Sequence, residues 1–236
     1  MSLRFSIEKL KQGLSKTKKS LLGKITEVFG ASNSGKTQIG MQLAVNLNKM
    51  SEKYVTAYID TENTFVASRV YQIAELKGLK QKKVLNSIKL VRTLDTSDLT
   101  HYVERVKDLI QANHDVRLVI IDSLLAPFRS EFIGREVLAE RQQKLAALLY
   151  TLKKYAQIYN FAVFFTNQVL TKPDQLFGDP TTATGGNVVS HYSHYRLYLR
   201  NGRKGTRIAK LTDSSNMPEG EAAFEISNRG VTDVEL

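Results

Sequence analysis

Apolar runs alternate with segments of helical periodicity along most of this 236-residue chain. The runs that predict buried strands lie at residues 25–29, 54–60, 88–91, 118–122 and 161–166. Between these runs, apolar residues recur every three or four positions, which predicts helices. Strands that are apolar throughout and separated by helices are typical of a parallel sheet covered on both faces. The pattern therefore predicts an α/β fold.

The predicted helices are marked by apolar side chains at the spacing of one helix face: Ile39, Leu43, Ala44 and Leu47; Val70, Ile73 and Ala74; Leu99, Val103, Val106 and Ile110; and Leu138, Leu145, Leu149, Leu152 and Ala156. The second helix is expected to end near Gly78. Asp98 is the candidate N-cap of the third helix. The fourth, predicted at residues 137–158, is the longest.

The pattern changes towards the C-terminus, after a long stretch without periodicity. Short β-rich runs follow at residues 195–200, 206–212, 221–227 and 231–234. The glycines between these runs predict hairpin connections. We therefore expect antiparallel strands to be added to the parallel sheet.

The N-terminal segment differs from the rest of the chain in its low apolar content. Its middle is predicted to form one helix, with Ile7, Leu10 and Leu14 at the spacing of one helix face. The sequence is accordingly divided into a basic arm, residues 1–22, and one core domain, residues 23–236. A single domain of this length can bury a substantial hydrophobic core.

The charge of the chain favours an acidic partner. The formal net charge is +11 and the sequence pI is near 9.7. Part of the excess comes from lysines in and just after the arm: Lys9, Lys11, Lys16, Lys18, Lys19 and Lys24. A pI above about 9 suits a protein that binds nucleic acid, although a basic soluble enzyme can have the same charge.

Two further features of the composition exclude classes of protein. The chain has no cysteine, which excludes disulfides and thiolate metal sites. No apolar run has the ~18 residues that a membrane span needs, and the first residues lack the apolar core of a signal peptide. We expect a cytoplasmic protein, or a nuclear one in a eukaryote, that does not bind a membrane.

One glycine-rich segment fits the phosphate-loop pattern G-x-x-x-x-G-K-[ST]: Gly30-Ala31-Ser32-Asn33-Ser34-Gly35-Lys36-Thr37. The glycines allow successive backbone N–H groups to face one anion. Lys36 adds a positive charge for the β- and γ-phosphates, and Thr37 offers a hydroxyl to Mg²⁺. A glycine- and serine-rich turn is the alternative, but the predicted strand before the loop and the helix behind it favour nucleotide binding.

Polar residues follow the predicted strands at the edge where an open α/β sheet binds its ligands. Asp122 follows a wholly apolar run and has the form of a Walker B acid that holds Mg²⁺ through water. Glu62 lies just past another strand, where a carboxylate can activate a water, with Asp60 and Thr61 as rivals. Gln168 can contact both a γ-phosphate oxygen and the water. Turn or surface roles remain the alternative for each.

Two predicted loops carry residues suited to a polynucleotide. Arg129 and Arg135 belong to a glycine-containing loop, with Arg141 just beyond it. Arginines in such a loop suit phosphate contacts, although salt bridges with nearby glutamates are the alternative. The second loop, from residue 169 to about 190, contains Gly185, Gly186 and Asn187, and a loop of ~20 residues in a compact domain is usually functional or disordered.

From Gly23 to its end, the chain resembles the ATPase core of the RecA-like DNA recombinases, in the branch of archaeal RadA and its eukaryotic relatives. The segments that carry the resemblance are Ile25 to Gly30, Ser34 to Gln38, Ile59 to Phe65, Ile121-Asp122-Ser123, Phe128 to Arg135, Leu138 to Gln143, Thr166-Asn167-Gln168-Val169, Gly185-Gly186-Asn187, Leu197 to Arg200 and Met217 to Ala222. Their order and spacing are more specific than a phosphate loop alone. The resemblance implies a RecA-like P-loop fold with a mostly parallel sheet.

The resemblance also implies roles for individual residues. The nucleotide and its Mg²⁺ would be bound by Gly30, Asn33, Ser34, Gly35, Lys36, Thr37, Gln38 and Asp122, with Arg69 packed on the adenine. Glu62, Lys36 and Gln168 would be the catalytic residues. Glu62 would be the catalytic carboxylate and Gln168 would sense the γ-phosphate. In that family the site lies between protomers, so Asp213 and Pro218 would cap a neighbour's nucleotide and His191 would reach across the interface. DNA would be bound by Arg129, Arg135, Arg141, Gly185, Gly186 and Asn187.

The chain departs from the family in features that bear on assembly. Among these 236 residues we expect no N-terminal helix-hairpin-helix domain, and we find no Phe-x-x-Ala segment of the kind that links protomers in the family. Thr181-Thr182-Ala183-Thr184 stands where basic and proline residues are usual, and Ser215 replaces a proline of the cap. The nucleotide motifs are complete.

Three functions are therefore considered. The first is an ATP-dependent recombinase core, a DNA-dependent ATPase that binds single- and double-stranded DNA and self-associates through its ATP interface. The second is a recombinase paralogue that assists a related, full-length recombinase without forming long filaments. The third is a P-loop ATPase that acts on proteins and ignores DNA, against which the arginine loop argues.

Overall fold

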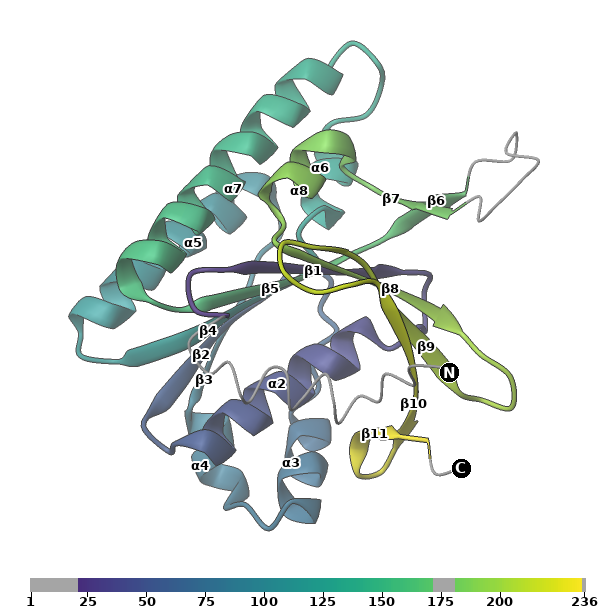
Figure 1. The fold of residues 1–236 in the computed structure, drawn as a ribbon. Coiled ribbons are helices and arrows are strands. Elements are labelled where there is room, and N and C mark those ends of the chain that lie inside the picture. Colours follow the sequence, from purple (N-terminus) through teal and green to yellow (C-terminus); the bar gives the residue numbers. More distant parts are fainter. Residues whose placement is uncertain (1–20, 172–180, 235–236) are drawn as a thin grey trace.

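The structure, a computed structural model, describes residues 21–171 and 181–234. A nine-stranded sheet forms its centre, in the order β11-β10-β9-β8-β1-β5-β4-β2-β3 (Figure 1). The strands are β1 (Ile25–Gly30), β2 (Tyr54–Asp60), β3 (Ile88–Arg92), β4 (Asp115–Asp122), β5 (Ala162–Asn167), β8 (Tyr195–Asn201), β9 (Arg207–Ser214), β10 (Gly220–Ser227) and β11 (Gly230–Asp233). Strands β1 to β5 and β8 pair in parallel, and β9, β10 and β11 continue from β8 in antiparallel hairpins.

Helices cover the parallel part of the sheet on both faces (Figure 1). On one face lie α2 (Lys36–Met50), α3 (Ala67–Leu76) and α4 (Gln81–Asn86), and on the other lie α5 (Thr96–Gln111), α6 (Ala126–Glu131), α7 (Leu138–Tyr159) and α8 (Gly186–Tyr192). Side chains alternate between the two cores along each strand: Val163 and Phe165 of β5 join the α5–α7 core, whereas Phe164 joins the α2–α3 core. The α/β fold with appended antiparallel strands is thus confirmed.

The predicted strands and helices are mostly where the periodicity placed them, but several details of the helices were wrong. The N-cap of α5 is Asp95, and Asp98 lies in the first turn, where its backbone N–H donates to Asp95 Oδ1 at 2.7 Å. Leu138, placed on the buried stripe of α7, is exposed. The short helix α4 was not predicted, because its six residues are too few to display a period.

The two predicted loops are more regular than expected. Arg129 lies in the short helix α6, and only the residues after Glu131 form an irregular connection to α7. The second loop begins with β6 (Val169–Thr171), pairs it with β7 (Thr181–Ala183) and continues into α8. Gly185 is the N-cap of α8, so Gly186 and Asn187 lie in a helix. Residues 172–180 of this loop lie outside the described residues.

The division at residue 22 falls at the limit of what the structure describes. Residues 1–20 of the arm, with the helix predicted around Ile7, Leu10 and Leu14, lie outside the described residues. Within residues 21–171 and 181–234, none of the helices is long and apolar enough to cross a bilayer.

The cap of α5 can be tested by substitution. Replacing Asp95 with Ala removes the side-chain acceptor of the Asp98 amide, and such caps are worth about 1 kcal/mol. We expect Asp95→Ala to lower the free energy of unfolding by that amount in urea titration. Asp98→Ala should cost only a few tenths of a kcal/mol, about the effect of a first-turn acid on the helix dipole. Equal losses for the two variants would contradict the assignment.

Candidate active site

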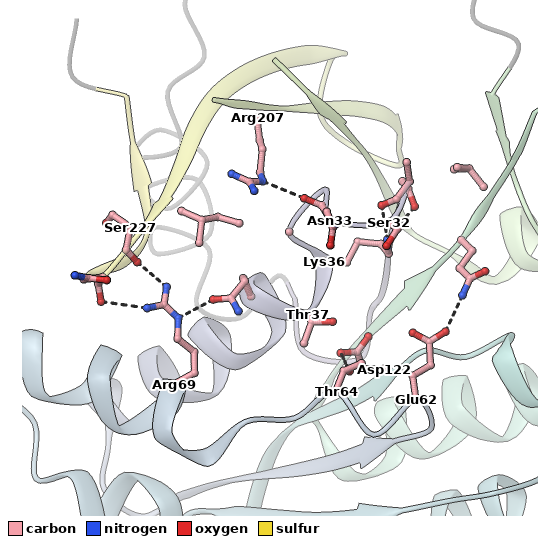
Figure 2. Close-up of a pocket in the computed structure, with 18 residues that line it drawn as sticks. Ser32, Asn33, Lys36, Thr37, Glu62, Thr64, Arg69, Asp122, Arg207 and Ser227 are labelled. Atoms are coloured by element: carbon pink, nitrogen blue, oxygen red, sulfur yellow. Dashed lines mark hydrogen bonds between the residues drawn. The ribbon is translucent and has the colours of Figure 1, made fainter. Parts of the chain in front are cut away.

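A cleft of about 780 Å³ opens where the carboxyl ends of β1, β2, β4 and β5 meet. The residues that line it come from segments far apart in the sequence: Gly30, Ala31, Ser32, Asn33, Gly35, Lys36, Thr37, Gln38, Glu62, Thr64, Arg69, Asp122, Gln168, Val169, Arg207, Ile226, Ser227 and Asn228. Figure 2 shows the loop with Asn33 and Lys36 above Thr37 and Asp122, with Glu62 and Arg69 on opposite sides. Nearly all predicted nucleotide residues are brought together here.

The loop before α2 can form only with glycine at its two ends. A methyl group at Gly30 would lie 2.3 Å from the carbonyl oxygen of Leu199 in the neighbouring strand β8. Gly35 has a φ of 101°, and a methyl group there would lie 2.8 Å from Cδ1 of Ile226. Ser34, within this loop, is fully buried and does not line the cleft.

The beginning of α2 is suited to an anion. Gly35 is its N-cap and provides no side-chain cap, and the first turn has no acidic residue. The first backbone N–H groups and the positive end of the helix dipole are therefore not neutralised by the helix's own side chains. This cradle fits the phosphate groups of a nucleotide.

Lys36 brings the positive charge of the cleft close to the loop. Its Nζ donates to the carbonyl oxygens of Gly30, at 2.9 Å, and Ala31, at 2.8 Å. Partial burial lowers the pKa of Lys36, and the carboxylates of Glu62 and Asp122 oppose this effect. The Lys36 ammonium thus lies between the phosphate loop and the carboxylates of Glu62 and Asp122. Phosphate oxygens of a bound nucleotide would replace the two backbone carbonyls as its partners.

Asp122 is held at the end of β4 by hydroxyl groups. Its Oδ2 accepts from Tyr58 Oη at 3.1 Å and from Thr64 Oγ1 at 3.4 Å, and its Oδ1 accepts from Thr166 Oγ1. Burial, with the adjacent Asp122 charge as a second cause, raises the pKa of the Tyr58 phenol well above its usual value. Tyr58 therefore stays a donor, and Asp122 is a pre-oriented acceptor at the cleft.

The structure distinguishes Glu62 from its two rivals. The buried Asp60 carboxylate accepts from the backbone N–H groups of Glu62, Thr64 and Phe65, at 3.0–3.3 Å. Thr61 Oγ1 donates to the Ser123 carbonyl at 2.7 Å and accepts from the Ser123 amide at 2.8 Å. Both side chains shape the turn, whereas Glu62 lines the cleft.

Gln168 contacts both the predicted catalytic acid and the first arginine loop. Its Nε2 donates to Glu62 Oε1 at 2.7 Å, and its Oε1 accepts from Arg129 Nη1. Ser123 Oγ donates to the same Glu62 oxygen at 3.2 Å. One amide side chain therefore joins a residue after β2 to a residue in α6.

Two arginines close the other side of the cleft. Arg69 in α3 donates through Nε to Gln38 Oε1 at 2.8 Å and through Nη2 to the Ser227 carbonyl at 2.6 Å (Figure 2). Arg207 in β9, which sequence reasoning missed, donates through Nε to the Asn33 carbonyl at 3.3 Å. The antiparallel strands thus contribute residues to a cleft that was predicted only from the parallel sheet.

The remaining predicted site residues lie away from the cleft. Arg135 is exposed in the connection between α6 and α7, and Arg141 is partly buried in the first turn of α7. His191 is exposed on α8 beside the Tyr192 ring. Asp213 in β9 and Pro218 before β10 are not among the residues that line this cleft. The interface roles implied for them concern a second protomer and stay predictions.

Sequence reasoning also missed Thr64, Ser227 and Asn228 at the cleft and Asn167 beneath it. Asn167 stands next to Gln168 and Thr64 stands two positions after Glu62, so proximity to the ends of strands was the available signal. Ser227, Asn228 and Arg207 gave no such signal, because their place depends on how the hairpins fold back towards the phosphate loop.

Comparison with known proteins identifies the family of this chain. The model of the Rad51 family matches residues 7–234. A DNA repair and recombination protein RadA of the archaeon Metallosphaera sedula is 41% identical over 215 residues, which cover 89% of this chain and 66% of the relative. The chain thus spans just under two thirds of that protein's length. Because the family match extends over nearly all of the sequence, the chain belongs to the Rad51 family.

Proposed function

We propose that this chain is the ATP-hydrolysing core of a DNA recombinase, which acts in homologous recombination and DNA repair. The observation that carries the proposal is the contact of Gln168 with both Glu62 and Arg129. It joins the cleft suited to a nucleotide to an arginine of α6 that is suited to DNA phosphates. The family membership and the RadA relative support the same function.

In the proposed reaction, the phosphate loop and Lys36 hold the β- and γ-phosphates of ATP. Thr37 and, through water, Asp122 would hold Mg²⁺, which would neutralise charge on the phosphates. Glu62 orients the attacking water and accepts its proton, while the Gln168 amide contacts the γ-phosphate. Arg69, on the opposite wall, packs on the adenine.

DNA binding is assigned to the surface beyond Gln168. The exposed Arg135, with Arg129 and Arg141, contacts DNA phosphates, and the segment around Gly185, Gly186 and Asn187 adds contacts at the start of α8. The net charge of +11, part of which comes from the basic arm at residues 1–22, attracts the polynucleotide. Single-stranded DNA is the expected first ligand, and double-stranded DNA the second during strand exchange.

Assembly between copies is the third part of the proposal. Asp213 and Pro218 of one protomer would cap the nucleotide of the next, and His191 would reach across the interface. ATP then favours the assembled state because both protomers contact it. A paralogue that assists a related recombinase is the second candidate, and the unusual Thr181-Thr182-Ala183-Thr184 segment favours it. Electron microscopy with ATP and single-stranded DNA separates long filaments from this alternative.

The function is tested by ATP hydrolysis measured with and without single-stranded DNA. We expect DNA to raise the steady-state rate of the wild-type chain. Glu62→Gln should lose about 10²-fold or more of this rate while it retains ATP binding, because an amide does not accept the proton of the water. Equal wild-type rates with and without DNA, together with no retention of DNA, would leave only a general ATPase.

The phosphate loop is tested by Lys36→Ala, with binding of a fluorescent ATP analogue as the measurement. Lys36 is the one lysine among the described residues that line the cleft, so this substitution removes its ammonium charge from the site. We expect loss of detectable binding at concentrations that saturate the wild-type chain. Unchanged affinity would refute the assignment of the loop.

The DNA surface is tested by Arg135→Ala. If Arg135 contacts one phosphate, its removal should weaken DNA binding and reduce the slope of log affinity against log salt by about one unit. Arg105→Ala is the matched control, since Arg105 is an exposed arginine of α5 that pairs with Asp108. A slope that Arg135→Ala leaves unaltered would remove Arg135 from the DNA surface.

A further inference from the structure

A single acidic residue is buried within strand β1, below the phosphate loop. Glu27 is fully buried between β5 and β8, in register with Phe165 and Arg196. Its Oε2 accepts from Arg196 Nε at 2.6 Å, and its Oε1 accepts from Asn167 Nδ2 at 2.7 Å. A buried carboxylate is costly unless it is paired and hydrogen-bonded, and Glu27 is both.

Asn167, at the end of β5, uses the full hydrogen-bonding capacity of its side chain. Its Nδ2 donates to Glu27 and, at 2.8 Å, to the Thr184 carbonyl. Its Oδ1 accepts from the Gln168 backbone N–H at 2.8 Å and from Thr184 Oγ1. Three of these bonds require this orientation of the amide, because rotation by 180° would turn Oδ1 towards two acceptors and Nδ2 towards the Gln168 N–H.

These bonds hold the two ends of the β6–β7 hairpin together. Gln168 precedes β6 and Thr184 follows β7. The Thr184 backbone N–H donates to the Gln168 carbonyl at 3.0 Å, and Thr184 Oγ1 contacts the same oxygen at 3.2 Å. The base of the hairpin is therefore closed by hydrogen bonds that converge on Asn167.

The orientation of Asn167 is set by the charge of Glu27. Arg196 Nε and Asn167 Nδ2 are both donors, so the group between them must offer two acceptors. A carboxylate does so, whereas a neutral amide of the same shape would turn a donor towards one of them. Arg196 is itself fixed, since its guanidinium lies 5.2 Å from the Phe29 ring centroid.

We propose that the buried Glu27 and the partly buried Arg196 form a positioning pair, which orients Asn167 so that Gln168 is held against Glu62 and the β6–β7 hairpin stays closed at its base. The pair touches neither the cleft nor the DNA surface, and acts only through Asn167. The proposal rests on the proposed function for its catalytic consequence, because it assigns Glu27 to the coupling of ATP hydrolysis to DNA.

The test uses Glu27→Gln in the full chain. ATP affinity should stay within about twofold of wild type, since the phosphate loop is unchanged, while the DNA-stimulated rate falls about tenfold, the effect of one lost hydrogen bond to a charged group. Hydrogen exchange of the nucleotide-free chain should show faster exchange at the backbone amides of Gln168 and Thr184. A substitution that only lowers the stability of the fold is not expected to reduce the DNA-stimulated rate while it leaves ATP affinity unchanged.

Two further variants make the outcome decisive. Thr184→Val removes the hydroxyl from the same network without a buried charge, so it should reproduce both effects and add little to Glu27→Gln in the double variant. Gln42→Leu is the control, because Gln42 is a buried residue that holds β11 through Val231, outside this network. Losses in Glu27→Gln that match those of Gln42→Leu would overturn the proposal.

The result also separates this proposal from the proposed function. If DNA fails to stimulate the wild-type chain, the recombinase function fails, and the exchange of the Gln168 and Thr184 amides still decides the positioning role. Wild-type exchange at both amides in Glu27→Gln would overturn it. If DNA stimulates both proteins equally, the function stands and the positioning role is refuted.

Discussion

Parallel pairing of β1, β5, β4 and β2 is the constraint on which the rest of the structure depends. Parallel strands end at the same edge of a sheet, so the residues after each strand meet although they are far apart in sequence. Gly30, Asp60, Asp122 and Asn167 end these four strands. The cleft, the acids and the Gln168 amide all follow from this one arrangement.

The polar groups at this edge are stabilised in different ways. The Asp122 carboxylate accepts hydrogen bonds from three hydroxyls and can still accept at the cleft. The Asp60 carboxylate instead accepts from backbone N–H groups of the turn that follows it. Glu27 is satisfied by Arg196 and Asn167 and lies below the cleft, where burial raises its pKa against the effect of both partners. In a low-dielectric interior each such group must be fully hydrogen-bonded. A substitution at one group therefore leaves its partners without a hydrogen bond, which lowers stability.

Much of the fold and part of the site could be predicted from residue patterns. The strands at residues 54–60 and 118–122 were predicted because β-rich or wholly apolar runs end in a single acid. Gly30 to Thr37 were recognisable because the phosphate loop requires its glycines, lysine and hydroxyl residue at fixed spacing within eight residues. The wrong cap at Asp98 and the wrong burial of Leu138 arose at helix ends, where periodicity is weak and neighbouring elements decide. The helix α8 was missed for the same reason, since seven residues show no clear period.

The sequence by itself determined the order of elements, the phosphate loop and the set of acids that compete for the site. These depend on local periodicity and on residues close together in the chain. Only the tertiary structure decided that Glu62 lines the cleft while Asp60 and Thr61 do not, that Arg207 approaches the phosphate loop, and that Glu27 orients Asn167. Those outcomes depend on contacts between residues up to 174 positions apart, whose geometry is set by the pairing and twist of the whole sheet.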